Sequence, residues 1–262
     1  MNILSSIVEY KQEELTKRKR ERRLSAFHEM PYFERAVFPL SERLQSTTPF
    51  AIIAEIKRSS PSAGILKTEF LPNLIATEYA DAGAAAISVL TDERFFSGSL
   101  TDLISVRDVV QIPVLRKEFI IDEYQIFEAK AYGADAILLI AAILDRSHLQ
   151  ELVAAAKELQ LQCLVELYDV REIDKLDFDQ MNIIGINNRD LRTFEVNIHH
   201  SIEIRRHLPE NIIVVSESGI RGPGDLHLLA NAGIHAALIG EHFMKSDSPG
   251  GELETLLNAF IS

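Results

Sequence analysis

The chain has 262 residues, of which 47% are hydrophobic, and it carries a formal net charge of −12. This length and apolar content allow one large core, and the negative charge argues against a nucleic acid as the main partner. The single cysteine, Cys163, excludes an internal disulfide and a cysteine metal site. No apolar stretch approaches the roughly 18 residues of a membrane span, and the polar start does not resemble a signal peptide. We therefore expect a cytoplasmic protein that does not bind membranes.

Residues 1–46 differ in character from the rest of the chain. They are rich in charge, and apolar residues such as Ile3, Ile7 and Leu15 recur at helical spacing. The basic run at 17–23 is interrupted by Glu21 and has no flanking aromatic residues, which favours a solvated helix face over a nucleic-acid patch. Because no linker follows in the interior, we predict a single domain over 1–262, of which 1–46 is a helical N-terminal extension.

From Pro49 onward, short apolar runs alternate with helical patterns. Eight runs predict strands, at 50–56, 84–90, 112–115, 136–140, 162–165, 183–186, 212–215 and 236–239. Helices are predicted at 71–82, 100–110, 122–132, 146–159, 170–176, 199–207, 225–232 and 252–260. Strand centres lie roughly 20 to 35 residues apart, which is the length of one βα unit.

A weak internal repeat supports this division. Gly83, Gly133 and Gly233 each follow a predicted helix and come just before an apolar run, where glycine supplies a left-handed cap. Eight parallel units either form an open sheet or close into a barrel. Since no Gly-x-Gly-x-x-Gly turn follows the first strand, the pattern favours an α/β fold of the (β/α)8 TIM-barrel type.

In such a barrel the active site lies at the carboxyl ends of the strands. The residues that follow the predicted strands are strongly polar: Glu55, Lys57, Ser60, Lys117, Glu118, Glu166, Asn187, Arg189, Glu217, Ser218 and Glu241. Charges that converge on one mouth repel one another or lose hydration at a cost, so their presence needs a reason. A structural ion-pair network is one interpretation, and we favour a catalytic site.

Lys117 is the first candidate for a catalytic group. It ends the apolar run that begins at Pro113, at the predicted mouth of the core. Partial loss of hydration there lowers the pKa of an ammonium, and we expect a proton donor or nucleophile near neutral pH. The alternative is a lysine whose stem covers the strand end while its ammonium reaches solvent.

The ends of the seventh and eighth strands indicate a phosphate site. Gly219 follows the seventh strand, and Gly240 and Glu241 follow the eighth, each before a short helical segment. Backbone N–H groups at such turns bind a phosphate dianion, although a single glycine there is also typical of an ordinary turn. The pair predicts a phosphorylated small-molecule substrate.

Several of these segments resemble one known family. They are Glu-Ile-Lys-Arg-Ser-Ser-Pro-Ser at 55–62, Lys-Glu-Phe at 117–119, Leu-Val-Glu at 164–166, Asn-Asn-Arg-Asp-Leu at 187–191 and Ser-Glu-Ser-Gly at 216–219. Together they resemble indole-3-glycerol-phosphate synthase of tryptophan biosynthesis, and the likeness covers nearly the whole chain. One departure is Glu118, where the family usually has aspartate.

The resemblance implies a lyase without cofactor or metal. It would convert 1-(2-carboxyphenylamino)-1-deoxyribulose 5-phosphate to indole-3-glycerol phosphate with loss of carbon dioxide and water. Lys117 matches the general acid of ring closure, and Lys57 matches a lysine near the substrate carboxylate that also serves as a second acid. Glu55 and Glu166 supply carboxylates for proton removal and hydroxyl departure, with the base and the orienting group left unassigned.

The resemblance also implies the binding residues and partners. The substrate-holding positions are Ser60, Phe96, Phe119, Asn187, Arg189, Glu217 and Ser218. Phe96 and Phe119 would form the walls around the anthranilate ring. Association with other tryptophan-pathway enzymes is a further expectation. The histidines at 199, 200, 207, 227 and 235 fall in or beside helices, with no pair aimed at the strand ends, so we expect no metal site.

Three other functions were weighed. Phosphoribosylanthranilate isomerase needs a cysteine and aspartate pair, and Cys163 lies inside a predicted strand, which is the wrong place. A Schiff-base aldolase also uses a lysine at a strand end. A non-catalytic phosphate-binding barrel would leave the paired lysines and glutamates unexplained.

Overall fold

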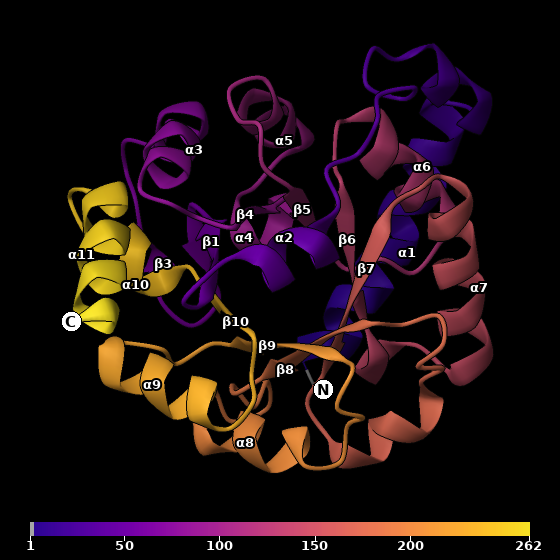
Figure 1. The fold of residues 1–262 in the computed structure, drawn as a ribbon. Helices are drawn as coiled ribbons and strands as arrows, with labels where there is room; N and C mark the ends of the chain where they lie inside the picture. The colour runs from indigo at the N-terminus through magenta and orange to yellow at the C-terminus, as the bar shows by residue number, and fades with distance from the viewer. Residues whose placement is uncertain (1–2) are drawn as a thin grey trace.

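The computed structural model describes residues 3–262, and its eight main strands are parallel and closed into a barrel, as predicted (Figure 1). The strands are β1 (Ala51–Ile56), β4 (Ala86–Leu90), β5 (Val114–Lys117), β6 (Ala136–Ile140), β7 (Gln162–Leu167), β8 (Ile183–Asn187), β9 (Ile213–Glu217) and β10 (Ala236–Ile239). β10 pairs with β1 and closes the ring. Each strand pairs with its neighbours in chain order, which brings all carboxyl ends to one face of the barrel.

Helices surround the barrel and follow the predicted order (Figure 1). They are α3 (Pro72–Asp81), α5 (Leu100–Arg107), α6 (Glu123–Ala131), α7 (Arg146–Glu158), α8 (His199–Arg205), α9 (Pro223–Asn231) and α11 (Pro249–Ile261). The α-helix expected at 170–176 is instead a 3-10 helix, η3 (Val170–Lys175). Gly83, Gly133 and Gly233 have φ values of 96°, 89° and 74°, so the predicted left-handed caps are confirmed.

The loops after the strands hold short elements, of which the sequence pattern predicted only the helical segment after the eighth strand. They are β2 (Ser59–Ser60), β3 (Gly64–Ile65), α4 (Glu93–Phe96), η2 (Ala141–Ile143) and α10 (Glu241–Met244). None is long enough to show a period of its own. All lie on the carboxyl side of the barrel strands, where they surround the predicted site.

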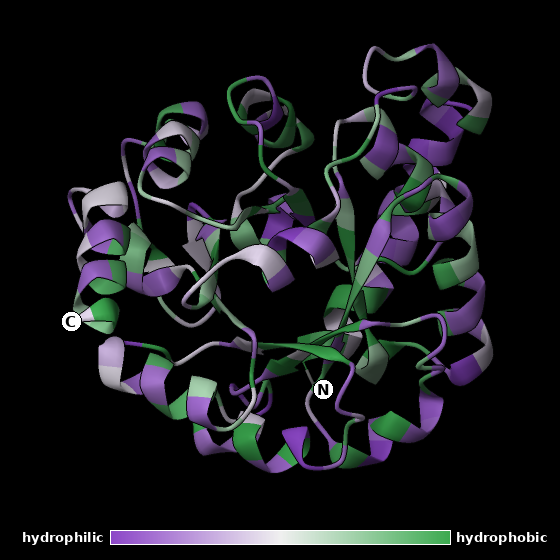
Figure 2. Ribbon diagram, viewed as in Figure 1, coloured by the Kyte–Doolittle hydropathy of each residue, from purple (hydrophilic) through white to green (hydrophobic). Residues whose placement is uncertain are grey.

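The core has two layers because successive strand residues point to opposite faces. On β5, Leu115 belongs to the cluster inside the barrel, whereas Val114 packs in the layer between strands and helices. Arg116 also lies in that outer layer, where it donates to the backbone oxygen of Gln125 and to Glu128 on α6. The strands are accordingly hydrophobic on both faces, while the helices carry polar residues outward (Figure 2).

The N-terminal extension is helical, as predicted for residues 1–46, and contacts both ends of the barrel. It contains α1 (Ile3–Glu21), η1 (Leu24–Glu29) and α2 (Leu40–Ser46); Met1 and Asn2 lie outside the described residues. α2 lies across the opening of the strand ring, where Leu40 and Leu44 are buried in the inner cluster (Figure 1). Ile7 of α1 joins the same cluster. Lys17 in the basic run is exposed, whereas Arg18 pairs with Glu128 at 3.1 Å.

One buried carboxylate fastens the extension to the barrel. Asp135, which is fully buried, accepts from Arg35 at 2.6 Å and from the Phe38 backbone N–H at 2.8 Å. Its second oxygen accepts from Arg107 at 2.6 Å and from the Val114 backbone N–H at 2.8 Å.

Within residues 3–262, no helix has the length and apolar character needed to cross a membrane.

We expect Asp135→Ala to lower the free energy of unfolding by about 3–5 kcal/mol, because the buried guanidinium of Arg107 and the partly buried one of Arg35 lose their shared anion. Chemical denaturation followed by circular dichroism measures the change. The exposed Asp179→Ala is the matched control and should shift the midpoint little. Equal midpoints for the two variants would contradict the role assigned to Asp135.

Candidate active site

A cavity of about 460 Å³ opens at the carboxyl ends of the strands. Its lining includes every residue predicted for the site: Glu55, Lys57, Ser60, Phe96, Lys117, Phe119, Glu166, Asn187, Arg189, Glu217, Ser218, Gly219, Gly240 and Glu241. The volume lies in the usual range for small-molecule sites. The parallel closed sheet explains this gathering, because it brings strand ends that are far apart in sequence to one rim.

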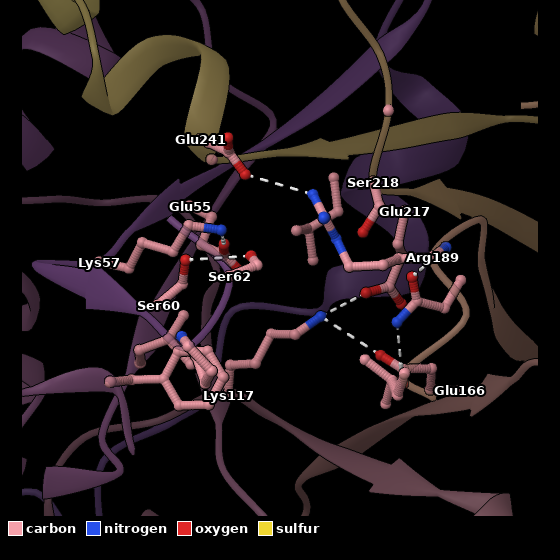
Figure 3. A pocket seen from close by; sticks show the side chains of 18 of the residues that line it. Glu55, Lys57, Ser60, Ser62, Lys117, Glu166, Arg189, Glu217, Ser218 and Glu241 are labelled. Carbon is pink, nitrogen blue, oxygen red and sulfur yellow. Dashed lines mark hydrogen bonds and ion pairs between the residues drawn. The ribbon is translucent and has the colours of Figure 1, made fainter. Parts of the chain in front are cut away.

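Lys117 ends β5 and points into the middle of the cavity, between two glutamates (Figure 3). Its ammonium contacts Glu217 and lies 3.4 Å from Glu166. Burial alone lowers the pKa of Lys117, but the charges of Glu217, Glu166 and Glu55 outweigh burial and raise it. The predicted lowering was therefore wrong, because the sequence showed the loss of hydration but not the three carboxylates. Lys117 is a protonated donor at neutral pH rather than a free amine.

Glu217, at the end of β9, has an unusual proton affinity. Burial, together with the charges of Glu166 and Glu55, outweighs the attraction of Lys117 and raises the pKa of Glu217 to about 8. Its Oε2 faces Lys117, while its buried Oε1 makes no hydrogen bond within the described part of the chain. A β-carbon at Gly185 would overlap Oε1, so the glycine on β8 makes room for this carboxylate.

A second ammonium–carboxylate pair lies on the first strand and its loop. Lys57 Nζ is 2.7 Å from Glu55 Oε1. Burial raises the pKa of Glu55, but the charges of Lys57 and Lys117 outweigh burial and lower it. A β-carbon at Gly240 would overlap the Glu55 carboxylate, because β10 lies directly beside β1. Gly240 therefore has a steric role besides the phosphate contact predicted for it.

Asn187 connects the sixth barrel strand to these charges. Its side-chain nitrogen donates to Glu166 Oε1 at 3.4 Å, and its oxygen accepts from the Arg189 backbone N–H at 3.0 Å. Ser60 lies in the β2–β3 hairpin and accepts from the Ala63 backbone N–H at 3.2 Å. These bonds fix Asn187 and Ser60 at the rim.

One wall of the cavity is apolar. The rings of Phe96 and Phe119 lie with their centroids 6.1 Å apart. Ile3, Leu4 and Ile7 of α1 complete this wall. The sequence marked Ile3 and Ile7 as a helical stripe, but nothing in the periodicity indicated that the stripe covers the cavity.

The other end of the cavity is rich in cations. Arg189 pairs with Glu241 at 3.2 Å (Figure 3). Lys245 pairs with the same carboxylate at 2.6 Å. Arg221 also lines this end, close to Gly219, whose φ is 81°. Arg221 and Lys245 were missed because they lie in a loop and directly after a short helix, beyond the strand ends. Within residues 3–262, no group of three His, Cys, Asp or Glu is placed to hold a metal ion.

The fold and the cavity define a (β/α)8-barrel enzyme whose site has an apolar wall, an ionised centre and a cationic end. The sequence model of indole-3-glycerol phosphate synthase matches residues 4–256. The chain therefore belongs to the indole-3-glycerol phosphate synthase family, whose members are decarboxylating lyases of tryptophan biosynthesis.

Relatives with this name are similar over most of their length. The indole-3-glycerol phosphate synthase of Salinibacter ruber is 45% identical over 258 residues, which cover 98% of this chain and 95% of the relative. That of Burkholderia multivorans is 50% identical over 203 residues, 78% of each chain.

Solved structures support the barrel alone. Tryptophan synthase subunit alpha from Legionella pneumophila superposes with a TM-score of 0.61 at 13% identity, covering 86% of this chain and 97% of the other. Thiamine phosphate pyrophosphorylase from Pyrococcus furiosus gives 0.61 at 14% identity, covering 84% and 98%.

The raised pKa of Glu217 predicts how stability depends on pH. A carboxyl with a pKa near 4.5 when unfolded and about 8 when folded holds its proton more tightly in the native state, so stability falls as pH rises from 4.5 to 8. Glu217→Gln removes this titration. We expect the melting temperature of the variant, relative to wild type, to be higher at pH 8.5 than at pH 5.5.

Differential scanning fluorimetry measures both proteins across this pH range. The exposed Glu210→Gln is the matched control and should leave the difference from wild type independent of pH. A pH-independent difference for Glu217→Gln as well would contradict the assigned pKa.

Proposed function

We propose that this cavity carries out the reaction of its family, with Lys117 as the acid that starts it. The proposal rests on one observation: a buried, protonated Lys117 is held by Glu166 and Glu217 at the centre of the cavity, beside the Phe96 and Phe119 rings. The substrate is 1-(2-carboxyphenylamino)-1-deoxyribulose 5-phosphate, and the product is indole-3-glycerol phosphate.

In the first step, the aromatic carbon that bears the carboxylate attacks the ketone carbon. The ketone oxygen takes a proton from Lys117 and becomes a hydroxyl group. The carboxylate then leaves as carbon dioxide, and its bonding electrons restore the aromatic ring. The raised pKa of Lys117 suits this step, because the ammonium is fully formed when the substrate binds.

In the second step, the new hydroxyl group leaves as water. Lys57 supplies the proton to the departing oxygen, and a glutamate takes a proton from the neighbouring ring methylene, which forms the indole double bond. Glu55 and Glu166 both lie in the cavity for this task. Two ammonium groups with separate carboxylate partners match two successive proton transfers.

The two ends of the cavity match the two ends of the substrate. Phe96 and Phe119 bind the anthranilate ring, while backbone N–H groups at Gly219 and Gly240 bind the phosphate with help from the cations beside them. The carboxylate of Glu241 repels a phosphate, so this residue contributes its backbone N–H while its side chain holds Arg189 and Lys245. Asn187, Arg189, Ser60 and Ser218 hold the chain of hydroxyl groups between the two ends.

We further propose that the enzyme needs no cofactor and works in the cytoplasm, within reach of other tryptophan-pathway enzymes. A single cysteine is typical of a reducing compartment, which supports this location.

The absence of tryptophan from the chain makes a direct assay possible. With the carboxyphenylamino-deoxyribulose phosphate as substrate, we expect indole emission to rise with wild type. Lys117→Ala should lower kcat by at least about 10²-fold, as expected for loss of a general acid. The matched control is Lys157→Ala, which removes a lysine that bonds to Gln180 on the outer surface and should retain full activity.

A rise of equal rate with Lys117→Ala would keep the activity and overturn the assignment of the acid. No rise with wild type would overturn the proposed function. Borohydride added during turnover should trap no lysine adduct, and a trapped adduct would favour the Schiff-base reaction instead.

A further inference from the structure

Helix α1 buries a charged residue in its apolar stripe. Its buried residues are Ile7, Lys11 and Leu15, and Lys11 is only 2% exposed. An ammonium removed from water destabilises a fold unless several anions surround it. Lys11 does not line the cavity, so no contact with substrate explains its position.

Three carboxylates surround the Lys11 ammonium. Its Nζ lies 2.7 Å from Glu14 on the same helix, 2.9 Å from Asp92 after β4 and 3.0 Å from Glu118 after β5. Burial lowers the pKa of Lys11, but the charges of Glu118 and Asp92 outweigh burial and raise it. One permanent cation therefore joins α1 to the ends of two adjacent barrel strands.

Asp92 connects this cation to the Phe96 ring. It is fully buried, and its Oδ1 accepts from the Phe95 backbone N–H at 2.6 Å, which caps α4. The last residue of α4 is Phe96. The position of this ring thus depends on the cap, and the other oxygen of the capping carboxylate faces Lys11.

Glu118 connects the cation to the Phe119 ring. Its Oε1 accepts from the Phe119 backbone N–H at 2.8 Å, and its Oε2 accepts from the Thr91 hydroxyl at 3.0 Å. The side chain of Glu118 also reaches the Lys11 ammonium at 3.0 Å.

We propose that Lys11 is a positioning residue, which sets the spacing of Phe96 and Phe119 through Asp92 and Glu118 and thereby controls binding of the substrate ring. This inference rests on the proposed function of the cavity. Without the cation, the buried carboxylates of Asp92 and Glu118 face each other across the ends of β4 and β5 and repel. The Phe96 and Phe119 rings then move apart. The phosphate end, formed by β8, β9 and β10, lies outside this cluster and should not respond.

Lys11→Met tests the inference, because methionine keeps the length and helix propensity of the side chain and removes its charge. Three quantities are measured well below the melting temperature. They are KM and kcat with the carboxyphenylamino-deoxyribulose phosphate, the dissociation constant of 2-aminobenzoate as a probe for the ring site, and the inhibition constant of inorganic phosphate. The matched control is Lys17→Met, which removes an exposed lysine of the same helix.

We expect Lys11→Met to raise KM and the 2-aminobenzoate dissociation constant about tenfold, to lower kcat less than threefold and to leave phosphate inhibition unchanged. A lower melting temperature with KM and 2-aminobenzoate binding within twofold of wild type would overturn the inference and leave Lys11 a purely structural residue. A parallel loss of 2-aminobenzoate and phosphate binding would also overturn it. Failure of wild type to form product would instead overturn the proposed function.

Asp92→Asn provides a second test that keeps the fold if Lys11→Met does not melt cooperatively. Asparagine still caps α4 but no longer pairs with Lys11 as an anion. We expect a rise of at least threefold in the 2-aminobenzoate dissociation constant, again without a change in phosphate inhibition. Unchanged 2-aminobenzoate binding would overturn the inference.

Discussion

The arrangement of the cavity depends on how buried charges are balanced at one rim of the barrel. Lys117 faces Glu166 and Glu217, and Glu55 adds a third carboxylate at longer range. The negative charge of this cluster keeps Lys117 protonated, and burial, together with the excess of negative charge, raises the pKa of Glu217 to about 8. Both a lysine and a glutamate at the rim therefore carry protons near neutral pH, which suits the two proton transfers of the proposed reaction.

This balance also constrains the backbone around it. The carboxylates of Glu217 and Glu55 fit only because the neighbouring strands carry Gly185 and Gly240, where any β-carbon would overlap them. Strand order therefore matters to the site, since β10 must lie beside β1 and β8 beside β9 for these close approaches. A glycine at such a position is required by the space that a neighbouring side chain occupies, and not by the conformation of a turn.

The sequence predicted the barrel and the composition of its rim because both follow from short-range patterns. Apolar runs such as 136–140 identify strands, and parallel order then brings residues such as Glu166 and Asn187 to the same face. The pKa of Lys117 and the contact of Ile7 with the cavity depend on distances between segments far apart in the chain. Periodicity gives the side of α1 that is buried but carries no information on which element covers it, so both features needed the structure.

The alternation of β5 explains how the proposed acid and its structural support are combined in one segment. Lys117 points into the cavity, and its neighbours Arg116 and Glu118 point to the outer layer, where Glu128 and Lys11 neutralise them. A strand end that carries a reactive ammonium on one side is thereby anchored by ion pairs on the other. Since the anchor includes α1, the extension is part of the site rather than an addition to the barrel. Its apolar residues Ile3 and Ile7 line the cavity, and its buried Lys11 contacts the carboxylates beside Phe96 and Phe119.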